Sequence, residues 1–350
     1  MENKIFNPER LLFARRLRSY SRAQLANLTG FSQRFIAYLE EGERIPSNET
    51  LIKLANALKV RSNFFYGESL PELDEKGVNF RAPSRTLQSL KRRLLCIASL
   101  SINFVEVVQK FLRLPFPNLP DLEGIEPEVA AEALREVWGL GVKPIGKLIP
   151  WFEKNGILVF SLPFGDETFD GFSFWYGNRA YIFVNTTRSI ERIRFDLVHE
   201  LGHLVLHRSS GARGIEMERE ANSFASAFLM PKSGILGSIN GPVSFEGLFK
   251  LKKVWRVSMV ALIRRLYNVG LITHWRYQSL CKYCAKNQYF HKEPDPLPRE
   301  EYAETSRLWP VVFKVLKNSN VSLSILSQKM GVYLEEIFSF LRGLVLTVVK

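Results

Sequence analysis

Two histidines four residues apart, with a glutamate directly after the first, place the strongest constraint on what this chain can fold into. The segment His199-Glu200-Leu201-Gly202-His203 fits the pattern H-E-x-x-H. Residues four apart lie one above the other on a helix, so both imidazoles can reach one ion at about 2.0–2.1 Å. Glu200 can then lie beside the open coordination position and accept a proton from bound water. The pattern predicts a helix that carries a zinc site.

The next predicted helix offers the third protein ligand that a tetrahedral catalytic zinc site requires. Three glutamates open it, Glu216, Glu218 and Glu220. Glu218 and Asn222 are four residues apart, so Glu218 can bind the ion while the Asn222 amide hydrogen-bonds a ligand histidine and fixes its ring. Glu220 points about 200° away from Glu218 on an ideal helix, which predicts a solvated side chain and leaves Glu220 as the alternative ligand. All three also suit a helix N-terminus without any metal.

His207 continues the series of histidines, but it lies about 12 Å along the helix axis from His199. Both ends of the series can hardly bind one ion together with His203, so we expect His207 to hydrogen-bond or pack beside a ligand. The extended pattern H-E-x-x-H-x-x-G-x-x-H fails, because Leu206 and Ser209 stand at its glycine and third histidine. The alternative to a metal site is a buried helix whose histidines are hydrogen-bonded within the core.

The composition is that of a folded protein with more than one domain. The 350 residues are 46% hydrophobic and 24% charged, and a chain of this length exceeds one ordinary core. No apolar run approaches the roughly 20 residues of a membrane span, and residues 1–10 are polar, unlike a secretory signal. Three cysteines, an odd number, do not describe a disulfide framework. We therefore expect a cytoplasmic protein without a membrane partner.

Residues 1–66 predict a domain of five short helices. Ser21 and Gln24 form a capping box, and the turn at 29–32 joins two helices in a helix-turn-helix pattern. This segment holds 11 Lys and Arg against six Glu and no Asp, in a chain with a net charge of +13, which favours a polyanionic partner. Polar capping residues stand where the five helices are expected to begin: Asn7, Ser21, Ser32, Ser47 and Ser62.

Beyond this segment, helical periodicity surrounds a short run of strands. Gly177-Asn178 between two apolar segments predicts a hairpin turn. The expected fold class is α+β, mainly helical, with a small sheet. The predicted strands are 157–162, 172–176 and 180–184. We expect four regions, namely the helix-turn-helix domain at 1–66, a linker and long helix at 67–125, a domain with the zinc site at 126–270, and a helical C-terminal region at 271–350.

The segment around the two histidines resembles the ImmA/IrrE-type metallopeptidases. The residues that carry the resemblance are Arg194-Phe195, His199 to His207 read as HELGHLVLH, Glu218 to Ala225 read as EREANSFA, and Phe228-Leu229-Met230-Pro231. The resemblance covers about residues 126–265. It implies a thermolysin-like zinc peptidase core that cleaves peptide bonds in proteins, and members of the family typically cut a transcriptional repressor.

The same resemblance implies a role for individual residues. His199, His203 and Glu218 would be the Zn²⁺ ligands and Glu200 the general base. The oxyanion-stabilising residue of the family has no clear match, and Tyr181 and His207 are the candidates. The strand at 180–184 is a hypothesis for pairing with an extended peptide substrate.

The N-terminal segment resembles the lambda-repressor/Cro-like (XRE) helix-turn-helix family, which implies binding to double-stranded DNA. Gln33, Arg34 and Ala37 would face the major groove, and Gln24 and Arg44 would contact phosphates. The alternative is a helical module of the same fold that binds protein. Such DNA-binding domains commonly act as dimers on two-fold sites, so a homodimer is one option. The matching residues are Gln24-Leu25-Ala26, Gly30-Phe31-Ser32, Ile36, Glu40, Gly42, Arg44 and Pro46.

Three further features carry less weight. Cys281 and Cys284 form half of a zinc ribbon, and ordinary thiols are the favoured interpretation. The basic residues at 250–253 and 264–265 predict a solvated helix face. Residues 322–341 have the pattern of a second helix-turn-helix pair, which we interpret as packing.

Two functions from different classes fit these patterns. The favoured one is a zinc-dependent site-specific endopeptidase coupled to DNA binding, which cleaves a repressor and so derepresses stress or mobile-element genes. The alternative is a DNA-binding regulator or antitoxin-like protein whose protease-like domain senses a metal or ligand. An intact H-E-x-x-H with Glu200 favours the enzyme, because a sensor has no need of a general base.

Overall fold

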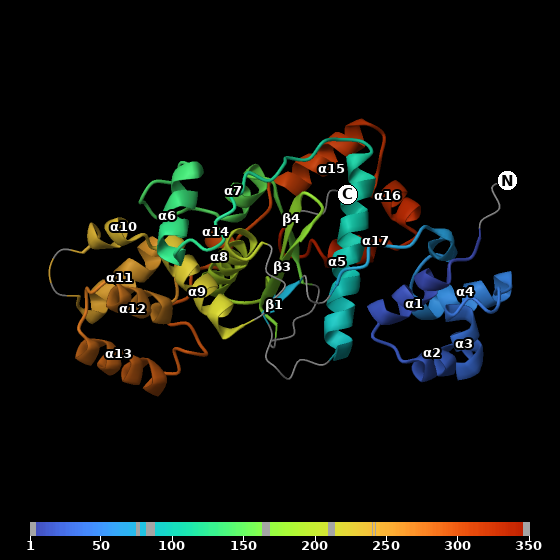
Figure 1. Ribbon diagram of the computed structural model, residues 1–350, viewed down its shortest axis with the longest axis horizontal. Helices are drawn as coiled ribbons and strands as arrows, with labels where there is room; N and C mark the ends of the chain where they lie inside the picture. Colours follow the sequence, from blue (N-terminus) through green and yellow to red (C-terminus); the bar gives the residue numbers. More distant parts are fainter. Residues whose placement is uncertain are drawn as a thin grey trace.

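The computed structural model describes residues 5–74, 78–81, 88–162, 169–208, 214–239, 241 and 243–345. In Figure 1 the N-terminal helices occupy one end of the long axis and the helices α11 to α13, within residues 245–286, the other, with a small sheet between them. Helices dominate the described chain, so the expected α+β, mainly helical fold class is confirmed. The domain boundaries at residues 66, 125 and 270 remain predictions.

The four α-helices of the N-terminal segment begin directly after the capping residues that the sequence indicated, Asn7, Ser21, Ser32 and Ser47, whereas the fifth element begins at Ser62 itself and has no side-chain cap. Ser21 accepts a hydrogen bond from the Gln24 backbone while the Gln24 side chain returns one, which completes the predicted capping box. Gly30 ends the second helix with a φ of 74°, a left-handed conformation that glycine adopts without steric cost. The elements are α1 (Pro8–Leu17), α2 (Arg22–Thr29), α3 (Gln33–Glu40), α4 (Asn48–Leu58) and the 3-10 helix η1 (Ser62–Tyr66).

The sheet has four strands in the order β1-β3-β4-β2. Strands β1 and β4 pair antiparallel with β3, whereas β2 and β4 run parallel. Strand β1 lies in a segment expected to be a linker, and it covers the edge of β3. The hypothesis that 180–184 pairs with a substrate is wrong, because both sides of β4 are occupied by neighbouring strands. The strands are β1 (Asn79–Arg81), β2 (Ile157–Ser161), β3 (Gly171–Tyr176) and β4 (Arg179–Val184).

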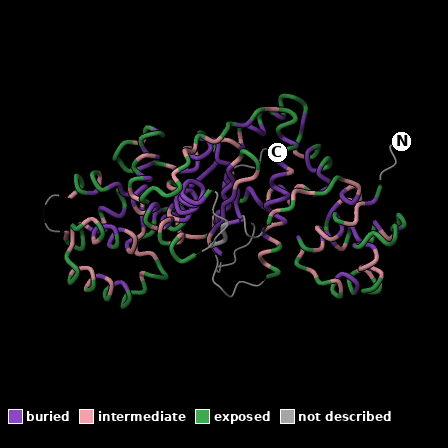
Figure 2. The backbone as a smooth tube through the Cα atoms, viewed as in Figure 1, coloured by how far each residue is buried: buried purple, intermediate pink, exposed green. Residues whose placement is uncertain are grey.

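Both faces of the sheet are buried, which explains the nearly continuous apolar sequence of β2. Alternate residues of β2, β3 and β4 enter two separate cores. The α8-side core contains Ile157, Val159 and Ile182 together with helices α8 (Ile190–Leu206) and α9 (Ile215–Leu229). The α5-side core contains Leu158, Phe160 and Phe183 together with the long helix α5 (Gln88–Gln109). Buried residues are concentrated where the sheet meets these helices (Figure 2).

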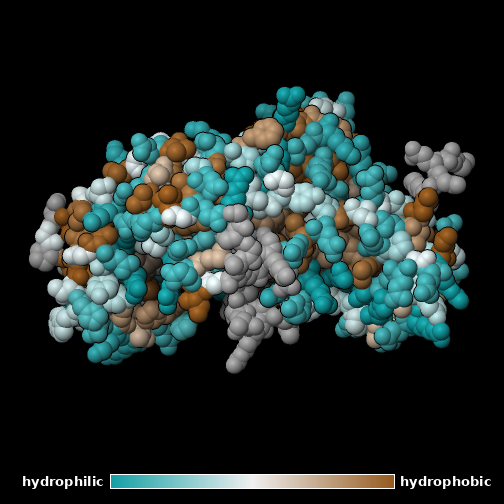
Figure 3. Space-filling model, in the orientation of Figure 1, coloured by the Kyte–Doolittle hydropathy of each residue, from teal (hydrophilic) through white to brown (hydrophobic). Residues whose placement is uncertain are grey.

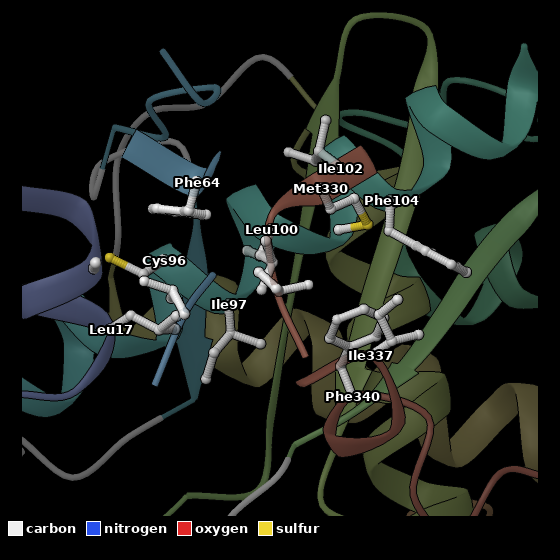
Figure 4. Close-up of a cluster of buried hydrophobic side chains, with 14 of the residues drawn as sticks. Leu17, Phe64, Cys96, Ile97, Leu100, Ile102, Phe104, Met330, Ile337 and Phe340 are labelled. Carbon is white, nitrogen blue, oxygen red and sulfur yellow. The ribbon is translucent and has the colours of Figure 1, made fainter. Parts of the chain in front are cut away.

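The α5-side core continues into the N-terminal domain and the C-terminal helices α15 (Leu308–Asn318), α16 (Leu323–Met330) and α17 (Leu334–Ser339). Figure 4 shows this continuity, with Leu17 and Phe64 from the N-terminal domain at the end of the cluster near Cys96 and Phe340 from the C-terminal region toward the other end. The 322–341 segment thus packs on α5, as we interpreted it.

Polar contacts reinforce this junction. Arg18 Nη2 lies 2.5 Å from Glu336 Oε2, and the Arg61 backbone N–H donates to the Gly331 carbonyl at 2.9 Å. Gly331 has a φ of 71°, and a Cβ added there would lie 2.6 Å from the Phe64 Cα. Glycine is therefore required at this position both by the backbone conformation and by the close approach.

The remaining helices surround the α8-side core and bury charges that the sequence did not indicate. Lys252 is fully buried, with its Nζ 2.7 Å from Glu191 Oε1, and Arg265 lies 2.7 Å from Glu128 Oε1. The expectation of a solvated face at 250–253 and 264–265 is therefore wrong for these two residues, because each pairs with a distant carboxylate. The helices are α6 (Pro127–Val137), α7 (Ile149–Lys154), α10 (Lys232–Leu236), α11 (Phe245–Trp255), α12 (Met259–Asn268), α13 (His274–Lys286) and α14 (Arg299–Tyr302).

The outer surface is mainly hydrophilic in the view of Figure 3, with apolar side chains in scattered groups. Among the residues that the structure describes, no helix combines the length and the apolar character needed to span a membrane.

Candidate metal centre

Helix α8 holds the H-E-x-x-H residues in a fully buried position. Ser189 caps the helix by accepting a hydrogen bond from the Arg192 backbone, and the side chains pack between the sheet and α9. His199 and Glu200 have no exposed surface, and His203 is 3% exposed. Buried polar groups of this kind require partners, because an unsatisfied one costs about 1–3 kcal/mol. Their contacts therefore indicate what the site is built to hold.

A glycine between the histidines allows α9 to approach. A Cβ at Gly202 would lie 3.1 Å from Phe224 Cδ1 and 3.3 Å from Ala221 Cα, closer than ordinary contact. The small residues Gly202 and Ala221 therefore let the two helices pack tightly. This close packing brings Glu218 of α9 over the histidines of α8.

Three potential ligand side chains converge at this point. His199 Nε2 and His203 Nε2 are 3.1 Å apart, Glu218 Oε2 lies 3.3 Å from His199 Nε2, and Glu218 Oε1 lies 3.4 Å from His203 Nε2. Ligands about 2.05 Å from a tetrahedral zinc ion are separated by about 3.3 Å. The spacing of the three groups thus matches the edges of such a coordination shell. Among the described residues, these three side chains form the one cluster of metal-ligating groups found.

The electrostatics of Glu218 favour its charged form. Burial by itself opposes the charge, but hydrogen bonds and charge interactions with His199 and His203 outweigh burial and hold the pKa of Glu218 well below its usual range. The side chain is 45% exposed, so the centre is open to solvent on this side. An ionised carboxylate at the open side is the form that a cation requires.

Asn222 contacts the first histidine as expected. Its Oδ1 lies 3.1 Å from His199 Nδ1. Because an amide oxygen accepts a hydrogen bond, His199 Nδ1 donates and the lone pair is on Nε2, which faces the centre. The spacing of Glu218 and Asn222 on one face of α9 explains both contacts.

The second histidine has a longer chain of partners. His203 Nδ1 lies 3.0 Å from His207 Nδ1, and His207 Nε2 lies 2.7 Å from Glu220 Oε2. His207 therefore contacts a candidate ligand and lies outside the cluster of ligand atoms. The expectation that Glu220 is only solvated is wrong, because α9 crosses the end of α8 and brings this carboxylate onto the His207 ring.

Glu200 is positioned by a residue that the sequence did not reveal. Ser173 of β3 donates to Glu200 Oε2 at 2.7 Å. Two residues earlier on the same strand, a Cβ at Gly171 would lie 3.5 Å from Glu200 Oε1 and 2.8 Å from the Phe183 carbonyl oxygen. The alternation of β3 places both positions toward α8. A serine within an apolar strand was the available signal, and its partner depended on the sheet packing.

The suggestion of Tyr181 as an oxyanion stabiliser is wrong. Its ring lies in the α5-side core, stacked on Phe174 with centroids 5.0 Å apart. Burial raises the pKa of Tyr181 above its usual value. The strand alternation that sends Ala180 and Ile182 toward α8 sends Tyr181 to the opposite face.

Arg194, which precedes the motif by five residues, anchors α8 to neighbouring segments of the chain. It is fully buried and pairs with Glu304, and its Nε donates to the Arg256 carbonyl at 3.0 Å and its Nη2 to the Ile145 carbonyl at 2.9 Å. Burial lowers the pKa of Arg194, and the neighbouring Glu304 partly counteracts that effect. Arg194 therefore fixes the position of the helix that carries the histidines.

Two of the predicted DNA-contacting side chains, Arg34 and Arg44, lie over one aromatic ring. Gln33 and Arg34 are exposed at the start of α3, and Ala37 is half-buried one turn later. The guanidinium carbons of Arg34 and Arg44 lie 5.3 and 5.5 Å from the centroid of the Tyr38 ring. Tyr38 thus joins the two arginines on one exposed surface, a contact that sequence spacing did not indicate.

Gln24 is exposed, but its side-chain oxygen accepts from the Ser21 backbone in the capping box. At the end of the same helix α3, Glu40 is buried and pairs with Arg15 at 2.5 Å and with Arg22 at 2.7 Å. Arg15 and Arg22 therefore neutralise a buried carboxylate within the domain. Arg34, by contrast, is exposed and lies over the half-buried Tyr38 ring of the same helix.

The two cysteines of α13 do not gather further ligands. Cys284 is buried and Cys281 half-buried. Burial raises the pKa of Cys284 to about 11, which disfavours the thiolate that metals bind. In the described part of the chain no metal-ligating cluster includes either cysteine.

Comparison with known families agrees with this geometry. Residues 152–267 match the Peptidase_M78 model, described as an IrrE N-terminal-like domain, and residues 11–65 match the helix-turn-helix model HTH_3. The matched segments lie within the regions predicted at 126–270 and 1–66. No curated protein matches the chain. The chain therefore carries an M78-type, IrrE N-terminal-like peptidase domain behind an N-terminal helix-turn-helix domain.

Proposed function

We propose that this chain is a zinc-dependent endopeptidase that acts on a protein substrate and is directed or controlled through DNA. The observation that carries the proposal is the convergence of His199, His203 and the Glu218 carboxylate at 3.1 to 3.4 Å from one another. Two imidazoles and one carboxylate are the ligand set of several catalytic zinc sites. The spacing of the three groups fits this ion, and Glu200 lies next to the first ligand in the helix.

The chemistry follows from the positions of the side chains. Zinc held by these three residues would polarise a peptide carbonyl and lower the pKa of a coordinated water to about 7. Glu200 would accept a proton from the attacking water and return it to the leaving amine nitrogen. Ser173 holds the Glu200 carboxylate in place at 2.7 Å, so that it does not have to be ordered when the substrate arrives. Asn222 orients the His199 ring.

We propose a transcriptional repressor as the protein substrate, because the peptidase domain is joined to a helix-turn-helix domain in one chain. On the DNA side, Gln33, Arg34 and Ala37 would read bases in the major groove, and Gln24 and Arg44 would contact phosphates. The exposed arginines around Tyr38 support this assignment. A homodimer on a two-fold operator fits this mode of binding.

Glu200→Gln separates the enzyme from the alternative, a DNA-binding regulator whose protease-like domain senses a metal. The variant keeps the shape of the side chain and removes the general base. We expect zinc and DNA binding to be unchanged and cleavage of a co-expressed repressor to fall by at least about 10²-fold. A regulatory response that persists in Glu200→Gln would favour the sensor.

The DNA assignment has its own test, the affinity of the full chain for a duplex selected from a random library. We expect the dissociation constant to rise steeply with salt concentration, because contacts with phosphates release counterions. Arg34→Ala should weaken binding by about 1–3 kcal/mol and relax the sequence preference. A dissociation constant that does not respond to salt would exclude the DNA-binding role.

A further inference from the structure

The two candidate histidine ligands are supported in different ways. His199 Nδ1 meets the neutral amide of Asn222. His203 Nδ1 meets His207, which in turn meets the carboxylate of Glu220. The second chain thus ends in a charged group. The contact between His207 and Glu220 has no part in the proposed proton transfers, so it calls for a separate explanation.

We propose that Glu220 and His207 form a positioning relay that fixes the tautomer and ring orientation of His203 and thereby sets the affinity of the centre for zinc. This inference rests on the proposed function, since it concerns a ligand of the proposed site. Neither residue touches the substrate or the reacting atoms in this proposal. Both act through His203.

The direction of each hydrogen bond follows from the chemistry of the groups. A carboxylate only accepts, so His207 Nε2 donates to Glu220 Oε2 across 2.7 Å. In the neutral ring His207 Nδ1 is then an acceptor, which makes His203 Nδ1 the donor across 3.0 Å. This arrangement places the lone pair of His203 on Nε2, the atom that lies 3.1 Å from His199 Nε2 and 3.4 Å from Glu218 Oε1.

The backbone supports the same arrangement. His207 is the C-terminal capping residue of α8, and its backbone N–H donates to the His203 carbonyl at 3.1 Å. The two rings lie one turn apart with centroids separated by 5.2 Å. The His207 side chain is 5% exposed whereas that of Glu220 is 41% exposed. The relay thus extends from a buried ligand to a carboxylate at the surface.

Four variants test the relay by zinc affinity, measured on the full chain by competition with a chromophoric chelator. His207→Leu removes both hydrogen bonds, and Glu220→Gln removes the charge at the partly exposed end. His207→Gln keeps one acceptor and one donor, so it should restore much of what His207→Leu loses. Glu216→Gln is the matched control, because this exposed carboxylate lies on the same helix and pairs with Arg219 at the surface.

We expect the zinc dissociation constant to rise by about 10- to 100-fold in His207→Leu and less in Glu220→Gln, and to stay unchanged in Glu216→Gln. Selective ¹⁵N labelling of the five histidines provides a second readout. In the zinc-loaded protein it should show the Nδ1–H tautomer at His203 and the Nε2–H tautomer at His207. Cobalt-substituted protein should show an altered visible spectrum in His207→Leu.

The outcomes separate the two proposals. If the wild-type chain binds no zinc, the proposed function fails. If the wild-type chain binds zinc and both His207→Leu and Glu220→Gln bind it equally well, the relay is wrong and the site stands. If His207→Leu does not fold, as judged by circular dichroism, Glu220→Gln and the tautomer of His203 still decide.

Discussion

The two faces of the small sheet pack against different parts of the molecule. Toward α8, Ser173 contacts Glu200, and the strands support the candidate metal centre. Toward α5, Phe160 and Phe183 belong to a core that extends without interruption into the N-terminal domain and the C-terminal helices. The difference is one of composition: polar side chains occur on the first face, whereas the second is almost entirely aromatic and aliphatic. The same strands therefore support the candidate metal centre on one face and the packing of the N-terminal and C-terminal helices on the other.

The α5-side core joins the helix-turn-helix domain to the peptidase domain by direct packing. The N-terminal domain is attached to the rest of the chain by more than the covalent connection, because Arg18, Arg61 and Asn63 bind the C-terminal segment at 328–336. Phe340 packs against both Phe104 of α5 and Phe160 of β2, with ring centroids 5.5 and 5.7 Å apart, so the N-terminal domain, α5 and the sheet share one core. Substitutions on one face should therefore reveal whether the two cores are energetically independent.

The largest effect is expected from Phe104→Ala. Phe104 is fully buried on α5, with its ring centroid 5.5 Å from those of Trp309 and Phe340. Truncation should lower the free energy of unfolding by about 3–5 kcal/mol in urea titrations. The zinc affinity of the folded variant should be unchanged.

The matched control for Phe104→Ala is Phe224→Ala in the α8-side core. This variant should lower stability similarly and also weaken zinc binding, because Phe224 packs against Gly202. Equal losses of zinc affinity in both variants would contradict the separation of the two faces.

A smaller effect is expected from Gly331→Ala. The new Cβ would lie 2.6 Å from the Phe64 Cα, in a backbone with a φ of 71°. Strain and displacement together should cost about 2–3 kcal/mol. Gly270→Ala is the control, since its φ is 79° and no atom lies within 4 Å of the added Cβ. It should cost only about 1 kcal/mol. Limited proteolysis within residues 67–74 should accelerate in Gly331→Ala alone, and identical behaviour of the two variants would exclude a tight junction.

The smallest effect is expected from Glu336→Gln. Each side chain of the Arg18–Glu336 ion pair is only about 14% exposed, but the Gln amide can still accept a hydrogen bond from Arg18, so Glu336→Gln should cost about 1 kcal/mol. A double-mutant cycle with Arg18→Ala isolates the pair from the bonds that Arg18 also makes to the Leu58 and Lys59 carbonyls. A coupling energy above about 2 kcal/mol would mean that this single contact, rather than the shared core, holds the N-terminal domain.

Features set by local chemistry could be predicted from the sequence. The capping box of Ser21 and Gln24, the left-handed Gly30 and the hairpin at Gly177 all depend on residues within one turn. The convergence of His199 and His203 also follows from helix periodicity alone. Glu218 required one further step, the assumption that the next helix packs back on the first.

Features set by contacts between distant segments could not be predicted. Lys252 lies in a run of basic residues that looked solvated, yet it is buried against Glu191. Glu220 was assigned to solvent because an isolated helix shows its direction relative to Glu218 and not what lies across from it. Strand order likewise depended on β1, whose three residues give no periodic signal. Each error arose from treating one element without its neighbours.

The most direct test of the proposed centre is the zinc content and coordination of the purified full chain. We expect one zinc ion per chain, with X-ray absorption showing two histidine nitrogens and carboxylate oxygen at about 2.0–2.2 Å. Binding should be lost in His203→Ala and strongly weakened in Glu218→Ala. The proposed centre would be contradicted if the wild-type chain bound no zinc, or if both variants bound zinc as tightly as the wild-type chain does.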